Sequence, residues 1–475
     1  MVKLLRVKRL GVFRRLKVGE GVLSFFIPVL YRLVLEVLAG SVPLGYDCVA
    51  FYVESVMYPS PFVEALEHFP VYNFLLVFMN FVIGDAFLTV KVGSVLVSGF
   101  LGYSIYRWLK ALGFRSNGLY YALLIFFFLP TLRMSWDLHR NCFGLSLALL
   151  SMSYLKEGRG KLACFLAFVA GFSHPFAAMS IVAMNFGSIF LRRDKAAFLV
   201  VFLSCFGMML TQLPSMFTYV YSQISSSLSR SFIERVVVAY VLGGWLLLPA
   251  VPFIKGVRRN FRRLVDGFGF ENFWWVFWFF VVSPFFYFSD RFIYMLGIPL
   301  GTIAVCNVML EGDERKQKAL FYVIMVSMAA YTSVGMFNTS IPLRYTSEVM
   351  RLFEYCRELL DDDSIVLVHR SLLGFALKAG IDPSKIIVVE PYENFTMKMN
   401  FTKGVKEVFA VWWLRGKYWE GGHPLVRVFP FLAGSYGLYD IPEDFKIIRE
   451  GRGFALYVYR RQNQVIYSYL LFWKF

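Results

Sequence analysis

Long apolar runs separated by short polar loops fill the chain from about residue 22 to residue 337. Runs that approach about 20 residues predict helices that cross a membrane rather than helices of a soluble core. Beyond Phe337 the apolar density drops and shorter segments alternate. The pattern therefore predicts a polytopic α-helical membrane module over residues 1–337, followed by a soluble domain over residues 338–475.

The composition supports this division. The chain is 58% hydrophobic and 17% charged, whereas soluble proteins average about 45–50% apolar and about 25% charged residues. A formal net charge of +17 would suggest a nucleic-acid partner for a soluble protein. Here lysine and arginine gather in short loops between apolar runs, where they orient the spans. We therefore expect contact with membrane lipids and no nucleic-acid partner.

Basic short loops face the cytoplasm, and this rule starts the chain inside and ends it outside. We expect about 11 spans in the cytoplasmic membrane. They are predicted at about 22–42, 86–106, 118–133, 142–155, 162–174, 176–191, 197–213, 236–254, 273–288, 292–310 and 319–337.

The charged residues within the first two of these spans are Arg32, Glu36 and Lys91. Arg32 and Glu36 are four residues apart on one face of the first span, and we expect them to form a structural ion pair. Lys91 lies near the outer end of its span, where we expect its side chain to snorkel toward the interface.

The first outside loop, residues 43–85, contains no lysine or arginine. Its segment 69–85 is apolar but short, which leaves two alternatives. As a full span, it would place the basic loop 107–117 outside. As a helix lying along the outer face, it leaves that loop inside, and we prefer this second interpretation.

The soluble domain shows alternating helical and strand patterns. Residues 346–363 predict an amphipathic helix, and residues 371–380 predict a second helix. Strands are predicted at 364–369, 385–390, 407–414 and 454–460. This alternation predicts a small α/β domain on the extracytoplasmic side.

The stretch MSWDLHRN, residues 134–141, places Asp137, His139 and Arg140 between two apolar runs. The flanking runs are too short for full spans, so the turn is expected to lie below the outer membrane surface, inside the protein. Charges at that depth are costly unless they pair or line a wet cavity, and they then suggest function. If the turn is helical, Asp137 and Arg140 share a face and could pair. The structural alternative is a polar turn that caps two short helices.

The order of these features resembles the GT-C superfamily of integral membrane glycosyltransferases, which use polyprenyl-phosphate-linked sugars. An early aspartate, Asp47, follows the first span within Gly45-Tyr-Asp47. A Phe69-Pro-x-Tyr72 segment leads a short helix that ends at Ile83-Gly-Asp85. The other matching segments are Trp136-Asp-Leu-His-Arg140, Ser173-His-Pro175 and Asp290-Arg-Phe-Ile-Tyr294, with an outside C-terminal domain. The chain departs from the superfamily in having no acidic pair in the first loop and no WWD-type signature.

The resemblance implies roles for individual residues. Asp47 is the candidate catalytic base; its structural alternative is a helix-terminal aspartate. Arg291 is the first candidate for the donor phosphate, because arginine can bind phosphate through two parallel hydrogen bonds; the alternative is an interfacial arginine paired with Asp290. Arg140 and His139 would also bind phosphate, with Asp137 supporting them. His174 could bind donor or acceptor, although a histidine that caps a helix is the simpler interpretation.

The sequence thus predicts a glycosyltransferase of the cell envelope, transferring a hexose or pentose with inversion. The donor would be a polyprenyl-phosphate sugar, and the acceptor a lipid-linked glycan, a protein or a cell-surface polymer. The six cysteines have no zinc-ligand spacing. A divalent metal is left open without support from the sequence, and arginines could neutralise a monophosphate leaving group without one. Two other classes remain open: a transporter or flippase of lipid-linked saccharides, and a non-catalytic glycan-binding membrane subunit.

Overall fold

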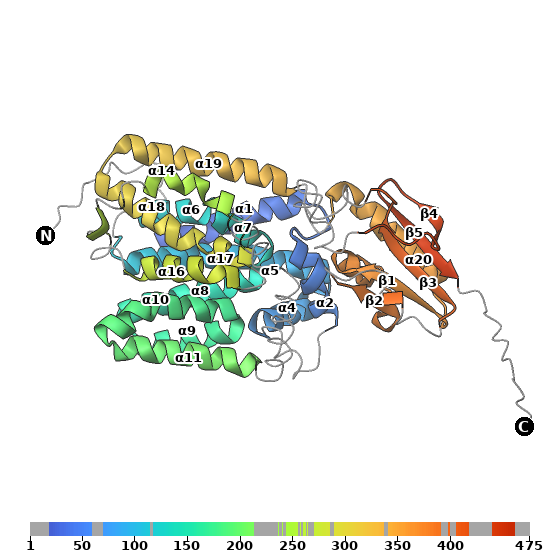
Figure 1. Ribbon diagram of the computed structural model, residues 1–475, viewed down its shortest axis with the longest axis horizontal. Coiled ribbons are helices and arrows are strands. Elements are labelled where there is room, and N and C mark those ends of the chain that lie inside the picture. Colours follow the sequence, from blue (N-terminus) through green and yellow to red (C-terminus); the bar gives the residue numbers. More distant parts are fainter. Residues whose placement is uncertain are drawn as a thin grey trace, which may run out of the picture. The chain divides into compact units, whose positions relative to one another are not determined.

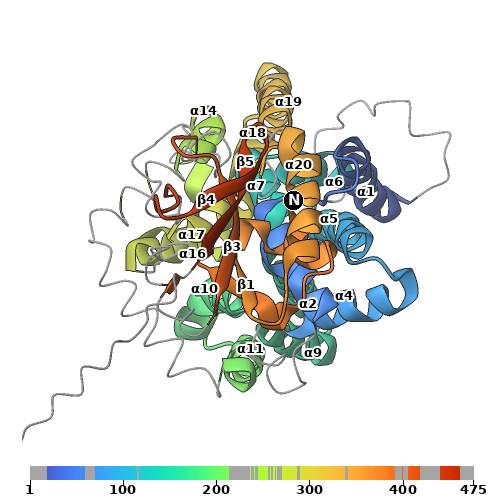
Figure 2. The ribbon, with the colours of Figure 1, turned by 90° about the vertical axis from the view of Figure 1, so that its right-hand side faces the viewer.

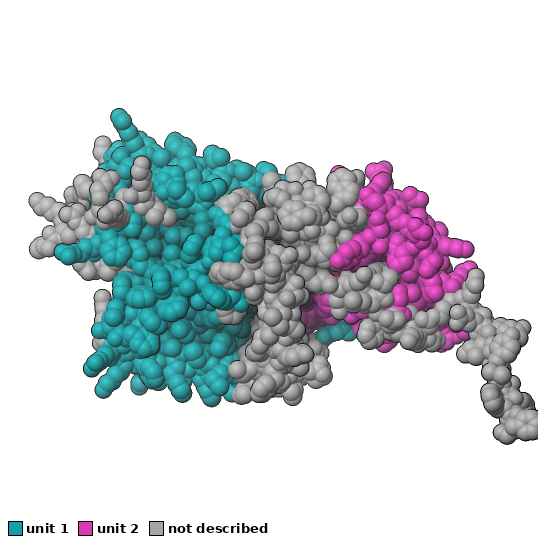
Figure 3. All heavy atoms as spheres, viewed as in Figure 1, with its two compact units in different colours: residues 1–44, 58–336 teal, residues 45–57, 337–475 magenta. Residues whose placement is uncertain are grey.

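The computed structural model describes residues 19–58, 70–114, 117–212, 244–254, 270–285, 289–336, 341–390, 405–417 and 439–460, with a few single positions between them. The chain forms two compact units, coloured separately in Figure 3. Unit 1 comprises residues 1–44 and 58–336, and unit 2 comprises residues 45–57 and 337–475. Residues 45–57 of the expected first outside loop, which include Asp47, therefore belong to unit 2.

Unit 1 is helical throughout its described part, and its long helices run side by side, as α9, α10 and α11 do in Figure 1. Its first helices are α1 (Glu20–Leu38), α4 (Pro70–Ile83), α5 (Ala86–Ala111), α6 (Gly118–Phe126), α7 (Leu129–Asp137), α8 (His139–Lys156), α9 (Gly160–Ser173), α10 (Pro175–Arg192) and α11 (Lys195–Gln212). The later elements are η4 (Gly244–Ala250), α14 (Val251–Ile254), α16 (Phe270–Val282), η5 (Ser283–Phe285), α17 (Ser289–Met295), α18 (Gly297–Glu311) and α19 (Glu314–Met336).

Small residues let these helices approach closely. A Cβ at Gly171 of α9 would lie 1.9 Å from the backbone oxygen of Ser204 in α11, and one at Gly99 of α5 would lie 2.4 Å from Cγ2 of Val29 in α1. Close backbone approach through small residues is the usual way in which membrane helices associate. Large side chains on the opposite faces are exposed, among them Phe165 and Phe202. This distribution suits helices that are surrounded by lipid.

The predicted number of about 11 spans is only partly matched. Among the described residues, 3 helices are long and apolar enough to cross a membrane, and up to 4 if one bent pair counts as a single span. That pair replaces the span expected at 118–133: α6 and α7 are bent by 65° at their break. The break follows from Pro130, which occupies the first turn of α7 and cannot continue the hydrogen bonding of a preceding helix. Several remaining apolar helices have 10–17 residues.

Unit 2 contains a five-stranded sheet in the order β2-β1-β3-β5-β4. The strands are β1 (Ser364–His369), β2 (Ile386–Val389), β3 (Glu407–Trp413), β4 (Lys446–Glu450) and β5 (Phe454–Arg460). The first three are parallel to one another, and β5 is antiparallel to both β3 and β4. Helix α20 (Thr346–Leu359) packs against β3 and β5, as Figure 2 shows. The expected small α/β domain is present, but β4 was not predicted.

Shorter elements complete unit 2. They are η2 (Cys48–Tyr52), α2 (Val53–Met57), η6 (Leu343–Tyr345), η7 (Arg370–Leu372), α21 (Leu373–Lys378) and η8 (Pro383–Lys385). The carboxylate of Glu348, in the first turn of α20, accepts hydrogen bonds of 3.0, 3.1 and 2.9 Å from the backbone N–H groups of Arg452, Gly453 and Phe454. This side chain therefore fixes the connection between β4 and β5 to α20.

Candidate functional site

The polar stretch MSWDLHRN forms the junction between α7 and α8. Helix α7 ends at Asp137, and α8 begins at His139. Leu138 between them has φ −89° and ψ 54°, which interrupts the helix. Asp137 and His139 are 6% and 0% exposed. The expectation that this turn lies inside the protein is therefore correct for these two side chains, while Arg140 is half-buried.

Asp137 pairs with a residue that the sequence did not indicate. Its Oδ1 lies 2.5 Å from Nη1 of Arg133, one turn earlier in α7. The Arg133 guanidinium also lies over the ring of Tyr294 in α17, 5.0 Å from its centroid. The expectation that Asp137 and Arg140 share a helical face assumed a continuous turn, whereas Leu138 interrupts the helix between them. The pair Arg133–Asp137 links α7 to α17 through Tyr294.

His139 is enclosed at the start of α8. The hydroxyl of Tyr72 in α4 lies 3.5 Å from its Nδ1, at the long end of the hydrogen-bond range. Tyr72 is 0% exposed, and its ring also packs against Phe143. Tyr72 belongs to the Phe69-Pro-x-Tyr72 segment, but no function was predicted for it from the sequence. Helix α4 thus reaches the α7–α8 junction through one tyrosine.

His174 forms the N-cap of α10. Its Nδ1 accepts a hydrogen bond of 3.2 Å from the backbone N–H of Phe176, and the residue is 4% exposed. A neutral imidazole that accepts at Nδ1 carries its proton on Nε2, which is then a donor. The simpler interpretation, a histidine that caps a helix, is confirmed.

Two further predicted residues, Arg140 and Arg291, lie near His174. The charges of Arg140 and Arg291 both act on its imidazole. Helix α8 approaches at Gly144, where a Cβ would lie 3.0 Å from the Cβ of His174. Helix α17 approaches through Phe292, whose ring centroid is 4.7 Å from that of Phe176. Arg140, His174 and Arg291 therefore lie in one region, although they come from three helices.

Helix N-termini add to the positive potential of this region. Arg140 is in the first turn of α8, and His174 caps α10, so the N-terminal ends of two 18-residue helices meet here. The N-terminus of a helix carries a partial positive charge and free backbone N–H groups, which favour anions. Arg291 is half-buried in the short helix α17. The side chain of the neighbouring Asp290 lies outside the described part of the chain.

A buried ion-pair network supports the α7–α8 junction. Arg32 and Glu36 are each 2% exposed, and their side chains lie 2.7 Å apart, so the expected pair is confirmed. Arg32 Nη1 also donates to the backbone carbonyl of Trp136 at 3.0 Å, and Nη2 donates to that of Leu44 at 2.9 Å. One buried guanidinium thus joins the first span to the end of α7.

Lys91 belongs to the same network. Its side chain does not snorkel to an interface as expected: the residue is 8% exposed, and Nζ donates to the backbone oxygens of Glu36, at 2.6 Å, and Gly40. The carbonyl of Glu36 is in the last turn of α1 and that of Gly40 follows the end of the helix, where a cation is favourable. The sequence could not indicate this contact, because the two partners lie in another helix.

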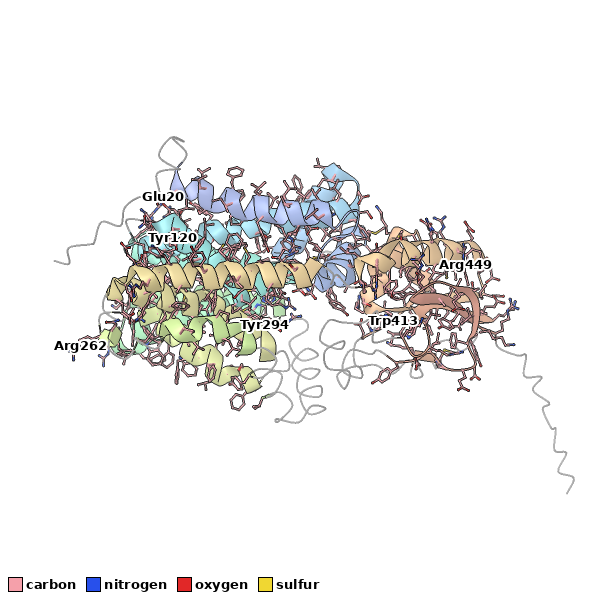
Figure 4. The ribbon with its side chains drawn as sticks, turned by 90° about the horizontal axis from the view of Figure 1, so that it is seen from above. Glu20, Tyr120, Arg262, Tyr294, Trp413 and Arg449 are labelled. Carbon is pink, nitrogen blue, oxygen red and sulfur yellow. The ribbon has the colours of Figure 1, made fainter. Side chains whose placement is uncertain are left out.

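The two ends of unit 1 differ in character. Figure 4 labels Glu20, Tyr120 and Arg262 toward one end of the helices, and Tyr294 farther along them in the direction of the other end. The hydroxyl of Tyr106 donates a hydrogen bond to Glu20, which places the end of α5 at the Glu20 end. The next residue, Arg107, pairs with Glu157 at 2.6 Å, and Lys156 pairs with Glu271 at 2.7 Å. The Tyr294 end has the α7–α8 junction. Basic loops and polar turns therefore gather at opposite ends.

Asp47 lies in unit 2 and is 6% exposed. It directly precedes η2, a π-helical stretch over Cys48–Tyr52. Short π-helical turns are rare and occur often at functional sites. Among the described residues, no group of three or more histidine, cysteine, aspartate or glutamate side chains could hold a metal ion.

Comparison with known proteins identifies the family. The model of the EpsG family matches residues 44–347, a segment that contains every candidate residue. The crystal structure of ArnT from Cupriavidus metallidurans bound to undecaprenyl phosphate is similar in fold, with a TM-score of 0.51 and 11% sequence identity over 91% of this chain and 97% of that chain. No curated protein is significantly similar in sequence. The resemblance to the GT-C superfamily of integral membrane glycosyltransferases is thereby confirmed, and the chain belongs to the EpsG family.

Proposed function

We propose that this protein transfers a sugar from a polyprenyl-phosphate donor to an acceptor on the non-cytoplasmic face of the membrane. The acceptor is a lipid-linked glycan, a protein or a cell-surface polymer, and the sugar is a hexose or a pentose. The observation that carries the proposal is the packing of α8 and α17 against the start of α10, through Gly144 and Phe292, which brings Arg140 and Arg291 near His174. The donor class is supported by the EpsG family match and by the undecaprenyl phosphate bound to ArnT.

The cluster has the chemistry of a site for a lipid phosphate. Arg140 and Arg291 would bind the phosphate oxygens, since guanidinium forms strong charge-assisted hydrogen bonds with phosphate. The Nε2–H of His174 would donate a further hydrogen bond, and His139 would bind phosphate or sugar from the same junction. Asp137 acts in support by holding Arg133 against α17, and Asp290 would orient Arg291. Donors fixed before the reaction stabilise charge that develops on the departing phosphate.

Asp47 is proposed as the general base. Its carboxylate takes the proton of the acceptor hydroxyl while the acceptor oxygen attacks the anomeric carbon of the sugar. The bond between that carbon and the phosphate oxygen breaks, and the polyprenyl phosphate leaves with the electron pair. A single displacement of this kind inverts the anomeric carbon. Two guanidiniums can neutralise a departing monophosphate, so the proposal needs no resident cofactor.

The proposed orientation places the α7–α8 junction toward the non-cytoplasmic side and the N-terminus inside. It is supported by the basic loops at the Glu20 end of unit 1, because such loops stay in the cytoplasm. Helix α4 has 14 residues, about 21 Å, which is shorter than the roughly 30 Å of a hydrocarbon core. Phe78 and Phe81 are exposed on it. We therefore propose that α4 lies along the membrane surface.

Sugar transfer by the purified protein in lipid tests the proposal. A panel of polyprenyl-phosphate sugars would be supplied to the wild type, to Asp47→Asn and to Asp444→Asn, an exposed aspartate of unit 2 that serves as the matched control. We expect Asp47→Asn alone to lose transfer while it retains donor binding. Equal transfer by all three proteins would exclude Asp47 as the base. Donor binding by the wild type without transfer to any acceptor would favour a transporter or a non-catalytic subunit.

A further inference from the structure

The segment that carries Asp47 is packed into unit 2, although it is separated from the rest of that unit by 279 residues of unit 1 (58–336). Cys48, Val49 and Ala50 are each 0% exposed, and Tyr52 is 1% exposed. A segment of the first outside loop is thus part of the core of the C-terminal domain. We refer to residues 45–57 as the inserted loop.

Close backbone contact holds the inserted loop against α21. A Cβ at Gly374, in the first turn of α21, would lie 2.5 Å from the backbone oxygen of Val49 and 2.9 Å from its Cγ1. Only glycine leaves room for this approach, because real Cβ atoms do not come so close to a carbonyl oxygen. The backbone of Val49 in η2 therefore packs directly against Gly374 in α21, with no side chain of Gly374 between them.

Arg370 adds a polar clamp to this contact. It follows β1 directly, at the carboxyl end of the parallel strands. Its Nη1 donates to Oε2 of Glu54, in the inserted loop, at 2.7 Å. Its Nε lies 2.9 and 3.0 Å from the two carboxylate oxygens of Glu390, which follows β2. The guanidinium also lies 5.1 Å from the ring centroid of Phe51.

The geometry of the clamp requires arginine. One edge of the guanidinium binds Glu390 at the sheet, while the other reaches Glu54 in the inserted loop, and the planar face covers Phe51. A lysine ammonium is a single point charge and cannot make these contacts together. The Arg370 side chain is 14% exposed, whereas those of Glu54 and Glu390 are 41% and 37% exposed. The arginine is thus the buried centre of the cluster.

We infer that Arg370 is a positioning residue that holds the inserted loop, and with it Asp47, in the conformation needed for proton abstraction. The inference rests on the proposed function of Asp47. A π-helical turn is less favourable than a regular helix and persists where its surroundings hold it. The contacts of η2 with Arg370 and Gly374 supply that support. The C-terminal domain accordingly contributes to catalysis by positioning Asp47.

Two buried cysteines provide an internal test of this role. Cys48 lies within η2, and Cys356 lies in α20 of the same unit; both are 0% exposed. Alkylation by iodoacetamide, located by mass spectrometry, reports opening of the inserted loop at Cys48 and opening of the domain core at Cys356. In Arg370→Ala we expect Cys48 to react at least about tenfold faster, because its loop has lost a charged tether. Cys356 should react at the wild-type rate.

Catalysis supplies the second measurement. We expect Arg370→Ala to lower kcat about 100-fold, the size of effect that a small misplacement of a catalytic group produces. The KM for the donor should stay unchanged, because the residues proposed to bind the phosphate belong to unit 1. Arg370→Lys should be intermediate. The matched control is Arg460→Ala, which removes an arginine of the same unit that is 75% exposed and paired with Glu407; it should resemble the wild type.

Several results would overturn the inference. Wild-type labelling of Cys48 in Arg370→Ala, or wild-type turnover, would each do so. Faster reaction of Cys356 as well would mean that Arg370→Ala has loosened the whole domain. Glu54→Gln would then decide, because it weakens only the contact of Arg370 with the inserted loop. An unchanged rate at Cys48 in Glu54→Gln would contradict the inference. Failure of the proposed function alone would appear as full transfer by Asp47→Asn, with Cys48 still responding to Arg370→Ala.

Discussion

Arg32 donates a hydrogen bond of 3.0 Å from Nη1 to the backbone carbonyl of Trp136, the residue before Asp137. Through this contact an ion pair of the first span holds the end of α7, more than 100 positions later in the chain. Trp136 is in the last turn of α7, next to the junction at which α8 begins. Arg32 is not a candidate for substrate binding, but it helps to fix the position at which α8 begins, and with it the positions of His139 and Arg140.

The network predicts a large stability effect for Glu36→Gln. The change leaves Arg32 and Lys91 buried without their shared carboxylate, and breaking a buried pair on one side costs about 3–5 kcal/mol. Thermal unfolding in detergent measures the loss. The control is Glu157→Gln, which breaks the more exposed pair with Arg107 and should cost about 0–1 kcal/mol. Equal losses in the two variants would show that the buried network contributes no more than a surface pair.

Low reactivity is predicted for the thiol of Cys356, which lies outside the membrane spans. Burial raises its pKa to about 12, so the reactive thiolate is scarce at neutral pH. Because the thiol is 0% exposed and reacts only when the core opens, we expect alkylation of the folded protein to be at least about tenfold slower than that of the denatured protein at the same pH, since only an accessible thiolate reacts. In denaturant the same residue should react as an ordinary thiol with a pKa near about 8.5. Equal rates in the folded and the denatured protein would contradict the burial.

Elements whose signal is local were predicted well from the sequence. The helices at 142–155, 162–174 and 197–213 appear as α8, α9 and α11 with shifts of a few residues at their ends. The pair Arg32–Glu36 was predicted because its partners are four apart in one helix. The edge strand β4 was missed, because the side chains of Ile447 and Ile448 are both exposed and no alternation marks it.

Features that depend on packing between distant segments could not be predicted. Pro130 signals a break, but the 65° bend between α6 and α7 depends on what surrounds it. The roles of Lys91 and Arg370 depend on partners that lie about 50 or more than 300 positions away. The sequence did indicate Arg140, His174 and Arg291 as separate candidates. Their meeting in one region is a property of how α8, α10 and α17 pack.

If Arg291 binds the donor phosphate, Arg291→Lys should weaken the binding of a polyprenyl phosphate. Lysine keeps the charge but loses the planar pair of donors that matches phosphate. Loss of one hydrogen bond to a charged group costs about 1.5–3 kcal/mol, so affinity for a polyprenyl phosphate should fall about tenfold or more. Binding to the protein in lipid nanodiscs measures it. Arg107→Lys, at the opposite end of unit 1, is the control and should bind normally; an Arg291→Lys protein with wild-type affinity would remove Arg291 from the site.

Gly144 is the position at which a single methyl group tests the convergence of α8 and α10. In Gly144→Ala the new Cβ would lie 3.0 Å from the Cβ of His174 and 3.1 Å from that of Ala177, closer than ordinary contact. The helices must separate, which costs about 1–3 kcal/mol as other overpacked sites do. His174 then moves relative to Arg140, and we expect donor affinity to fall together with stability. Gly160→Ala, in the first turn of α9 with nothing within 4 Å of the added Cβ, should leave binding intact and stabilise its helix by about 0.5–1 kcal/mol. Normal donor binding in Gly144→Ala, despite a measured loss of stability, would show that the spacing of α8 and α10 does not govern the phosphate site.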